Sequence, residues 1–456
     1  MTIRKRFLAG FAAAAIAGSM MAAVPAGADQ FNYNAVNGGD FTFNKYLVVD
    51  ENATIPKVQF SYTIQPDSAV TTTHLTSSNV ELYRGVNGAV MSATNGTADF
   101  TSASTTSTST ASVSNQTGGG TSTITILSGE YASGYKYATD SVVVDFTACS
   151  FTEPGVYRYK LTETTPTAPY SNLTDDARTL DVYVQDKGTG TDGELEVTGY
   201  VLYNTLVTGA PTNYQEAEAV AGIGFTSAEI DKTGTNENKK SSGFVNRYET
   251  VDLTVSKAVT GNQGSKDKYF KFTIKSNTTL ETTDKFYLSG DFEAAPTATS
   301  ATSYTTANMA VTANHAVLDN TTNTYYVTGA TLNAGYVIYM QANQNVVING
   351  LPKGVSYTVT EDAENYTPST TVTGDTTNDN DLNNSDDDSS IASGNTVTVS
   401  DTNLTMDTIV AYTNNRTGTI PTGVILAVAG PAVVGLVVVG GIIVINAKRR
   451  REDAED

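Results

Sequence analysis

Short runs of alternating apolar and polar residues recur through the chain from Asp29 to Thr422. The clearest runs are VQFSYTI from Val58, TLDVYVQD from Thr179, YFKFTIKS from Tyr269 and VSYTVTED from Val355. Successive side chains of a β-strand point to opposite faces, so this alternation of β-branched and aromatic residues indicates half-buried strands. NYQEAEAVAG at residues 213–222 is the best candidate for an amphipathic helix. We expect an all-β protein, and because about 390 residues are too many for one sandwich, we expect two Ig-like β-sandwiches.

An internal near-repeat supports the count of two domains. Each half opens on a strand with a lysine, continues to a strand that ends in a glutamate, and closes on a strand with an asparagine shortly before a cation. The two ordered sets are Lys45, Glu163 and Asn246, then Lys257, Glu361 and Asn414. The predicted domains are residues 29–250 and 251–418.

These three residue types permit one particular reaction. A lysine amine that attacks a side-chain carboxamide forms an isopeptide bond and releases ammonia. In water the amine is protonated and the amide nitrogen leaves poorly. Burial disfavours the ammonium and raises the pKa of a nearby carboxyl, so a neutral lysine can attack while a protonated glutamate relays protons. Packing would hold the amine against the carbonyl carbon. A single such residue in a strand is most often a surface residue, and it is the repeated order that favours the reaction.

The two ends of the chain carry apolar segments of different kinds. Three cations precede an alanine-rich stretch at residues 7–23, and small residues allow cleavage between Ala28 and Asp29. This pattern predicts a secretory signal peptide over residues 1–28. Residues 424–447 contain no charge and are long enough to cross a bilayer as a helix, and a basic cluster follows them. The sequence therefore predicts an exported body held by its tail at the outer face of a membrane.

Composition excludes several classes of function. The formal net charge of −20 argues against nucleic acid as a partner, because phosphate neutralisation needs a basic surface. Cys149 is the one cysteine, so no intramolecular disulfide can form, and we expect a small buried residue there. His74 and His315 are the only histidines, and no zinc motif, phosphate-binding loop or nucleophile elbow occurs. We expect no enzyme, no metal site and no cofactor.

Two polar tracts are expected to be loops. Residues 101–123 are nearly all Ser, Thr, Gly and Asn, with little to bury. The acidic tract GDTTNDNDLNNSDDDSS begins at Gly374. Its spacing suggests a calcium loop, but the glycine and the closing glutamate of such a loop are missing, so a solvated loop is the preferred interpretation.

Together these features resemble the sortase-assembled backbone pilins of Gram-positive bacteria, in particular the two-domain T-antigen type with CnaB-like sandwiches. The resemblance covers nearly all of the mature chain and is carried by FNKYL, EPGVYRYKLTE, FVNRYETVDLTVSK, GLPKGVSYTVTE, AYTNN and the C-terminal tail. It implies a self-formed Lys–Asn isopeptide bond in each domain, promoted by a glutamate. The implied bonds are Lys45 to Asn246 with Glu163, and Lys257 to Asn414 with Glu361. Asn204 and Asn415 remain as alternative asparagines.

The C-terminal tail, residues 419–456, resembles a cell-wall sorting signal because a Pro-Thr-Gly turn precedes the apolar span and the short basic end. The motif consists of Ile420, Pro421, Thr422 and Gly423, with isoleucine where the commonest motif has leucine. The resemblance implies that the cysteine of a membrane-bound sortase cleaves between Thr422 and Gly423. A lysine of the next subunit, or the wall precursor, would then resolve the acyl-enzyme on Thr422.

The lysine that accepts this acyl group lies, in the T-antigen type, on a loop shortly before the last strand of the N-terminal domain. The matching stretch here is TGTNENKKSSGF, which contains Lys239 and Lys240. We favour Lys239. The alternative is that both are solvated lysines and that the linkage uses Lys232 or another residue.

The leading hypothesis is a structural protein: the shaft subunit of a covalently polymerised, cell-wall-anchored pilus, whose precursor lies in the plasma membrane. The expected partners are sortase, identical subunits, other pilins and cell-wall peptidoglycan, with host ligands as a further class. The alternative is a monomeric wall-anchored adhesin or a minor pilin with the same crosslinked domains. A monomeric adhesin needs Thr422 but no acceptor lysine, and the lack of an additional N-terminal binding domain favours the shaft.

Overall fold

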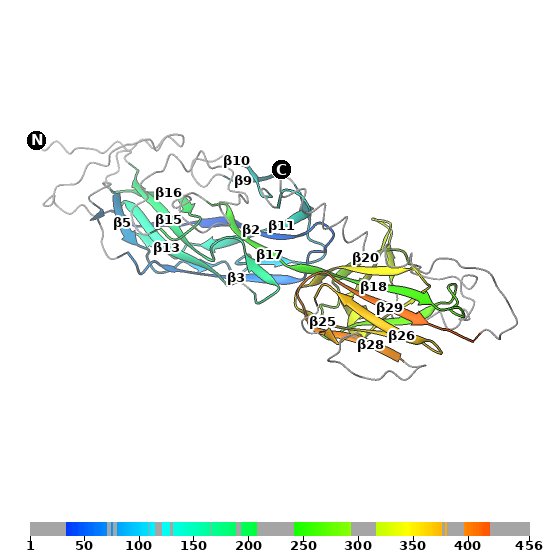
Figure 1. The fold of residues 1–456 in the computed structure, drawn as a ribbon. Coiled ribbons are helices and arrows are strands. Elements are labelled where there is room, and N and C mark those ends of the chain that lie inside the picture. The colour runs from blue at the N-terminus through cyan, green and yellow to red at the C-terminus, as the bar shows by residue number, and fades with distance from the viewer. Residues whose placement is uncertain are drawn as a thin grey trace, which may run out of the picture. The chain divides into compact units, whose positions relative to one another are not determined.

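The computed structural model describes residues 33–419 apart from 71–73, 76–79, 109, 115–120, 128–130, 165, 188–192, 208–240, 293–315, 376–378 and 381–395. The chain divides into two compact units, each with two main β-sheets (Figure 1). The first unit contains the chain up to Glu51 together with Lys57–Tyr248. The second contains Asn52–Pro56 and the chain from Glu249. The division thus falls beside the domain boundary expected after residue 250.

One sheet of the first unit has six strands and places the first long strand beside the last. In order across the sheet, the strands are β14 (Tyr170–Asn172), β17 (Gly243–Tyr248), β2 (Asp40–Asp50), β11 (Tyr135–Asp145) and β6 (Val90–Met91), and β8 (Thr106–Ser107) also pairs with β11. Strands β2 and β17 run parallel, whereas β2 and β11 run antiparallel.

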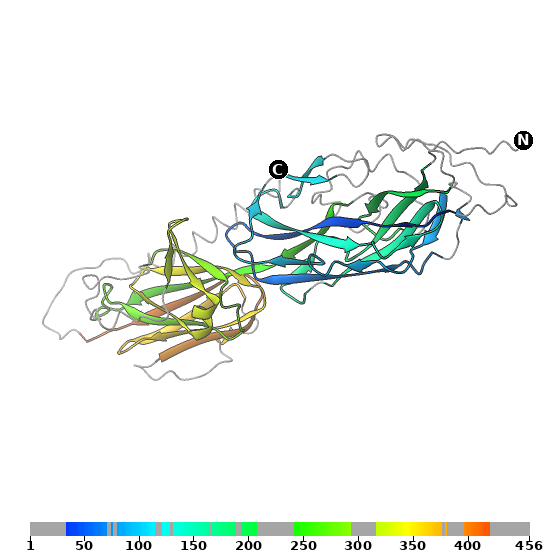
Figure 2. The same ribbon diagram turned by 180° about the vertical axis from the view of Figure 1, so that it is seen from behind.

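A second sheet packs against this one in the first unit (Figure 2). It has seven strands. They are β16 (Leu195–Leu202), β15 (Ala177–Asp186), β13 (Gly155–Thr164), β3 (Val58–Pro66) and β7 (Thr97–Phe100), with β5 (Val80–Arg84) parallel to β13 and β4 (His74–Leu75) paired to β5. Two small pairs form outside these sheets, β1 (Val36–Asn37) with β12 (Ser150–Phe151) and β9 (Thr110–Ser114) with β10 (Thr121–Thr125).

Strand β2 is buried on both of its faces in its central part. Residues 45–49 are all buried, whereas an ordinary half-exposed strand alternates. Tyr46 and Val48 pack into a second hydrophobic cluster, away from the space between the sheets, which includes Ile126 and Tyr131. Because one face meets this cluster and the other meets the facing sheet, Lys45 on the inner face has no route to solvent, and its exposed fraction is 0%.

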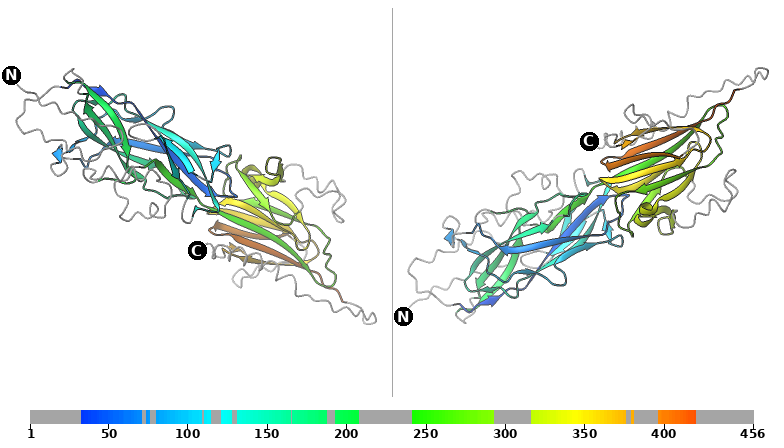
Figure 3. Two further views of the ribbon diagram at one scale, coloured as in Figure 1. Left: turned by 90° about the horizontal axis from the view of Figure 1, so that it is seen from above. Right: turned by 90° about the horizontal axis from the view of Figure 1, so that it is seen from below.

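The second unit repeats the two-layer arrangement (Figure 3). Its larger sheet contains β21 (Val317–Asp319), β22 (Thr324–Thr328), β20 (Lys285–Ser289), β24 (Asn345–Pro352), β18 (Thr250–Thr260), β29 (Thr408–Asn415) and β26 (Thr367–Thr373). Its smaller sheet contains β23 (Tyr336–Met340), β19 (Phe270–Ser276), β25 (Val355–Asp362), β28 (Thr396–Leu404) and β27 (Asp379–Asn380).

Among the described residues the one helix is α4 (Gly329–Ala334). The Thr328 hydroxyl caps it and accepts from the Thr331 backbone N–H at 3.2 Å.

The all-β fold with two sandwiches is confirmed. Cys149 is buried as expected, and the Tyr159 hydroxyl donates to its sulfur at 3.6 Å. The loop expected over residues 101–123 is wrong in part, because β8, β9 and the start of β10 lie within it. Threonine favours strands, and antiparallel pairing satisfies the backbone even where little apolar surface is available. Strand β27 likewise lies inside the acidic tract.

Several predicted features lie outside the described residues. They are the signal peptide with its cleavage site between Ala28 and Asp29, the helix at 213–222, the lysines Lys232, Lys239 and Lys240, the motif Ile420, Pro421, Thr422 and Gly423, and the apolar span that follows it. In the part of the chain that is described, no helix is both long and apolar enough to cross a membrane.

Candidate functional site: two buried Lys–Glu–Asn clusters

In the first unit, strand register places the predicted lysine and asparagine on the same side of one sheet. Lys45 on β2 lies opposite Phe244 on the parallel strand β17, and Asn246 follows two residues later. Side chains two residues apart in a strand share a face, so Asn246 points to the side that Lys45 occupies. Glu163 comes from β13 of the facing sheet, where it lies opposite Tyr62 on β3. The two sheets therefore deliver the three predicted residues to one point between them.

The second unit repeats this register. Lys257 on β18 lies opposite Tyr412 on the parallel strand β29, and Asn414 again follows two residues later. Glu361 on β25 lies opposite Phe272 on β19 of the facing sheet. The repeated order of residues in the sequence thus corresponds to a repeated position in the fold.

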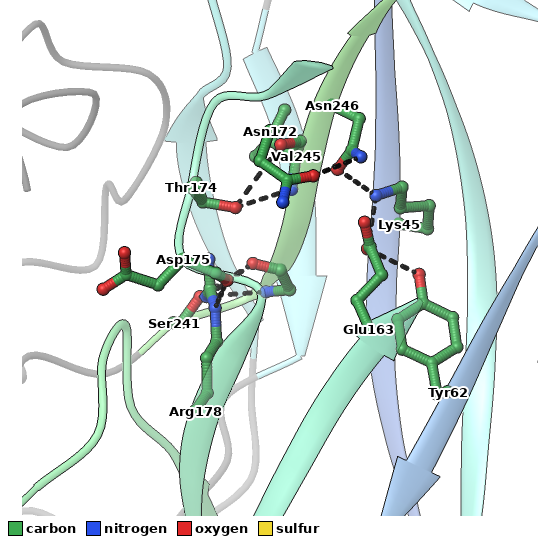
Figure 4. A network of polar contacts seen from close by, with 11 residues as sticks. Lys45, Tyr62, Glu163, Asn172, Thr174, Asp175, Arg178, Ser241, Val245 and Asn246 are labelled. Atoms are coloured by element: carbon green, nitrogen blue, oxygen red, sulfur yellow. Dashed lines mark hydrogen bonds and ion pairs between the residues drawn. The ribbon is translucent and has the colours of Figure 1, made fainter. Parts of the chain in front are cut away.

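Hydrogen bonds join all three residues of the first site (Figure 4). The Lys45 Nζ donates to Glu163 Oε2 at 2.5 Å and to Asn246 Oδ1. The Tyr62 hydroxyl donates to the same Glu163 oxygen at 3.2 Å. The Asn246 Nδ2 donates to Asn172 Oδ1 at 2.8 Å. The carboxamide of Asn246 is therefore held at both of its polar atoms, with its oxygen toward the lysine.

Burial makes the Lys45 amine easier to deprotonate than an ordinary lysine. Desolvation lowers the pKa of Lys45 to about 8, against the opposing attraction of Glu163, and the Arg178 guanidinium lowers it further. The amine also lies over the Phe60 ring, with Nζ 4.1 Å from the ring centroid. A neutral, nucleophilic amine is thus far more accessible here than in water.

The second site holds the same groups in a different contact pattern. The Lys257 Nζ lies 2.7 Å from Glu361 Oε1, an ion pair without hydrogen-bond geometry, and Asn414 Nδ2 donates to the same oxygen at 2.9 Å. Burial lowers the pKa of Lys257 to about 8 and raises the pKa of Glu361. Glu361 Oε2 and Asn414 Oδ1 are buried without a hydrogen-bond partner. A buried ion pair with unmet polar atoms is costly, and formation of a neutral amide between Lys257 and Asn414 would remove it.

Arg178 and Gly243 fix the start of β17, and sequence reasoning did not identify either of them. The buried Arg178 Nη1 donates to the Gly243 carbonyl at 2.7 Å and to the Ser241 hydroxyl, and the guanidinium lies over the Phe244 ring. Gly243 has φ +156°, and a Cβ there would lie 1.6 Å from the Asn44 carbonyl oxygen. Only glycine allows β17 to approach β2 this closely, so these residues help to set the register that brings Asn246 to Lys45.

The alternative asparagines do not occupy the clusters. Asn415 is exposed, and it follows Asn414 on β29, so its side chain points to the opposite face. Asn204 follows β16, which lies at the far end of the facing sheet from β3 and β7. Tyr62 and Asn172 also contact the first site, although no sequence signal pointed to them.

The pH dependence of stability tests whether the two buried lysines have lowered pKa values. In the double variant Asn246→Ala, Asn414→Ala, which cannot form either bond, Lys45 and Lys257 stay free to titrate. Their folded pKa of about 8 lies below the unfolded value of 10.5, so between these values the unfolded chain binds more protons. The free energy of unfolding should therefore rise with pH in this window, and chemical denaturation at pH 8 and at about pH 9.5, below tyrosine titration, measures it. The unaltered protein is the control, because linked lysines no longer titrate, and a fall in stability of the variant over this range would contradict the assignment.

The chain is similar to one family model and to one curated protein. A family model described as a domain of unknown function, DUF7601, matches residues 251–390, which include Lys257 and Glu361. A curated protein named Pilin from Streptococcus pyogenes serotype M1 is 25% identical over 414 residues, covering 89% of this chain and 89% of the relative. The chain is thus a homologue of a streptococcal pilin.

The similar solved structures include two streptococcal pilins. The crystal structure of the major pilin from Streptococcus pyogenes matches with 19% identity and a TM-score of 0.45, covering 84% of this chain and 100% of that one. The major pilin protein T-13 from the same species matches with 17% identity and a TM-score of 0.43, covering 84% of this chain and 98% of that one.

Proposed function

We propose that this homologue of a streptococcal pilin is the shaft subunit of a covalently polymerised cell-surface pilus. The observation that carries the proposal is the Lys–Glu–Asn cluster, which occurs twice. It lies at the equivalent place in the strand register of each unit. A protein whose task is to bear load outside the cell, without disulfides, needs another covalent means of holding each sandwich together. The sorting signal and the relatives support the same role.

The reaction in each cluster follows from its groups. The lysine Nζ attacks Cγ of the asparagine, so the Nζ–Cγ bond forms and the Cγ–Nδ2 bond breaks. The glutamate accepts a proton from the attacking amine and returns one to the departing nitrogen, which leaves as ammonia. The neighbouring strands already hold the amine against the carboxamide, which supplies the gain of an intramolecular reaction. No proton is gained or lost overall.

The position of the bonds suits a load-bearing subunit. Lys45 and Asn246 lie on neighbouring parallel strands at the two ends of the first unit's sequence, and Lys257 and Asn414 do so in the second. A bond between them encloses nearly the whole domain in one covalent loop. Tension applied to the ends of a unit would then load this bond rather than the backbone hydrogen bonds between strands.

Assembly is proposed to use the C-terminal motif. Sortase would cleave between Thr422 and Gly423 and transfer the Thr422 carboxyl to Lys239 of the next subunit, with Lys240 as the neighbouring candidate. Transfer to the wall precursor would attach the finished polymer to peptidoglycan. Intramolecular bonding needs no enzyme, so the chain acts only as a substrate for sortase and catalyses nothing else.

A boiled SDS gel of wall extract, immunoblotted for this protein, tests the proposal. Covalent polymers survive boiling, so a shaft subunit gives a ladder of high-mass bands. A single band near monomer size would contradict the shaft and leave the wall-anchored adhesin as the function. Incorporation of one copy at most into a ladder of other pilins would identify a minor pilin.

A further inference from the structure

We propose that Asn172 is a catalytic residue of the first site. Its side chain accepts a hydrogen bond from the carboxamide nitrogen of Asn246 while that nitrogen leaves, and the second site works without such a residue. This inference rests on the isopeptide reaction proposed above and goes beyond it, since it makes the two sites unequal in mechanism.

The position of Asn172 is fixed by the sheet. β14 is a three-residue strand that pairs antiparallel with β17, and Asn172 lies directly opposite Asn246 in that pair. Its Oδ1 accepts from Asn246 Nδ2 at 2.8 Å, on the side of the carboxamide away from Lys45 (Figure 4). The orientation of both amides follows from Lys45. In its ammonium form Lys45 can only donate, so before reaction Asn246 turns its oxygen to Lys45 and its nitrogen to Asn172, which presents an oxygen.

The chemistry gives this contact a function. When Nζ of Lys45 attacks Cγ of Asn246, the carboxamide loses its planarity, and Nδ2 must gain a proton before the Cγ–Nδ2 bond breaks. A nitrogen that gains a proton becomes positive and donates more strongly, so the Asn172 oxygen stabilises it more in the transition state than in the ground state. The same hydrogen bond keeps the Asn246 nitrogen turned away from Lys45 and its oxygen turned toward it.

The second site lacks this arrangement at the corresponding position. β26 occupies the place beside β29 that β14 occupies beside β17, and the residue opposite Asn414 is Pro368. Proline has no side-chain acceptor. Asn414 Nδ2 instead donates to Glu361 Oε1, the oxygen that also contacts Lys257. One carboxylate oxygen therefore serves both the attacking and the departing nitrogen in the second site, whereas two separate residues do so in the first.

A site-resolved time course tests the inference in the full chain. Translation is stopped in producing cells, samples are denatured at intervals, and peptide mass spectrometry gives the linked fraction of the Lys45–Asn246 and Lys257–Asn414 peptide pairs. The two variants are Asn172→Leu, which keeps the approximate shape without an acceptor, and Asn172→Asp, which keeps an acceptor oxygen in place.

The leucine variant should link the first site about tenfold more slowly, in keeping with the loss of one hydrogen bond in the transition state. Its second site should link at the unaltered rate, and the aspartate variant should stay within about threefold of the unaltered protein at both sites. A leucine variant that links the first site as fast as the unaltered protein would overturn the inference. Equal slowing by leucine and aspartate would do the same, because it would assign the effect to packing.

Two further measurements distinguish a failure of the reaction from a failure of the variant to fold. If the unaltered protein retains both ammonia molecules, the proposed reaction itself fails, whatever the variants do. Resistance of the first unit to trypsin before linkage reports its folding. If Asn172→Leu loses that resistance, the smaller Asn172→Ala replaces it and is judged by the same tenfold criterion.

Discussion

The double variant Glu163→Ala, Glu361→Ala should be heavier than the unaltered protein by two ammonia molecules, after allowance for the substitutions, and each single variant should be heavier by one. Each glutamate is the only carboxyl that contacts its lysine in the described contacts of the two clusters. Without it, the attacking amine has no group to which its proton can pass, and general acid–base catalysis of this kind contributes roughly 10²–10⁴-fold. Intact mass spectrometry measures the difference directly.

A large loss of stability should accompany the missing bonds. A crosslink that closes a loop of one to two hundred residues stabilises a fold by about 5 kcal/mol in the chain-entropy account. For units of this size the melting temperature should fall by roughly 10–20 °C when each bond is lost. The variant Asn246→Ala, Asn414→Ala keeps both ion pairs, so its melting temperature separates loss of the bond from loss of the carboxyl.

Glu51→Ala, at an exposed carboxyl in a turn of the first unit, is the matched control and should change neither the number of ammonia molecules lost nor the melting temperature. Full mass in the unaltered protein, with both ammonia molecules retained, would contradict self-crosslinking. A Glu163→Ala chain that still loses both would remove Glu163 from the reaction.

Substitutions at the two ends of the proposed intersubunit bond should have different effects. Thr422→Ala keeps the backbone carbonyl but changes the motif that sortase is proposed to cleave, so the chain should neither polymerise nor reach the wall, and it should keep its uncleaved tail in the membrane fraction. Lys239→Ala removes the acceptor only, so the ladder should collapse to one band that is still attached to the wall. Immunoblots of wall and membrane fractions after boiling in SDS show both effects.

Lys187→Ala is the control for the acceptor, because Lys187 is an exposed lysine of the first unit whose side chain is 48% accessible. It should leave the ladder intact. A ladder that survives Lys239→Ala but is lost in Lys240→Ala would move the acceptor by one residue. A ladder that survives Thr422→Ala would contradict the sorting motif.

The second site could be predicted from sequence in part because β25 and β29 alternate between buried and less buried residues. VSYTVTED matches β25, in which Glu361 lies on the same buried face as Val355, Tyr357 and Val359. The order of lysine, glutamate and asparagine, repeated in two halves, favoured Lys45, Asn246 and their counterparts, with Asn204 and Asn415 left as alternatives. Each residue of the two Lys–Glu–Asn clusters is at most 3% exposed.

Other parts of the site left no signal in the sequence. Asn172 lies on a three-residue edge strand, and its role comes from pairing with a residue 74 positions away, which no local pattern encodes. In the sequence, Arg178 resembles any charged residue of a strand. Its function depends on β17, whose first residue, Gly243, accepts its hydrogen bond. The continuous burial of 45–49 depends on a cluster that includes Ile126, Leu127, Tyr131 and Tyr137, so a period-two pattern could not predict it. The polar tract at 101–123 was assigned by composition, which says nothing about pairing between strands.

The most direct test of the shaft is tandem mass spectrometry of polymer released from the wall and digested with trypsin. We expect a branched peptide in which the carboxyl of Thr422 is joined to the ε-amine of Lys239 from a second copy of the same chain. Thr422 found only on cell-wall peptide, with no branch to any lysine of this protein, would contradict the shaft and identify a wall-anchored monomer.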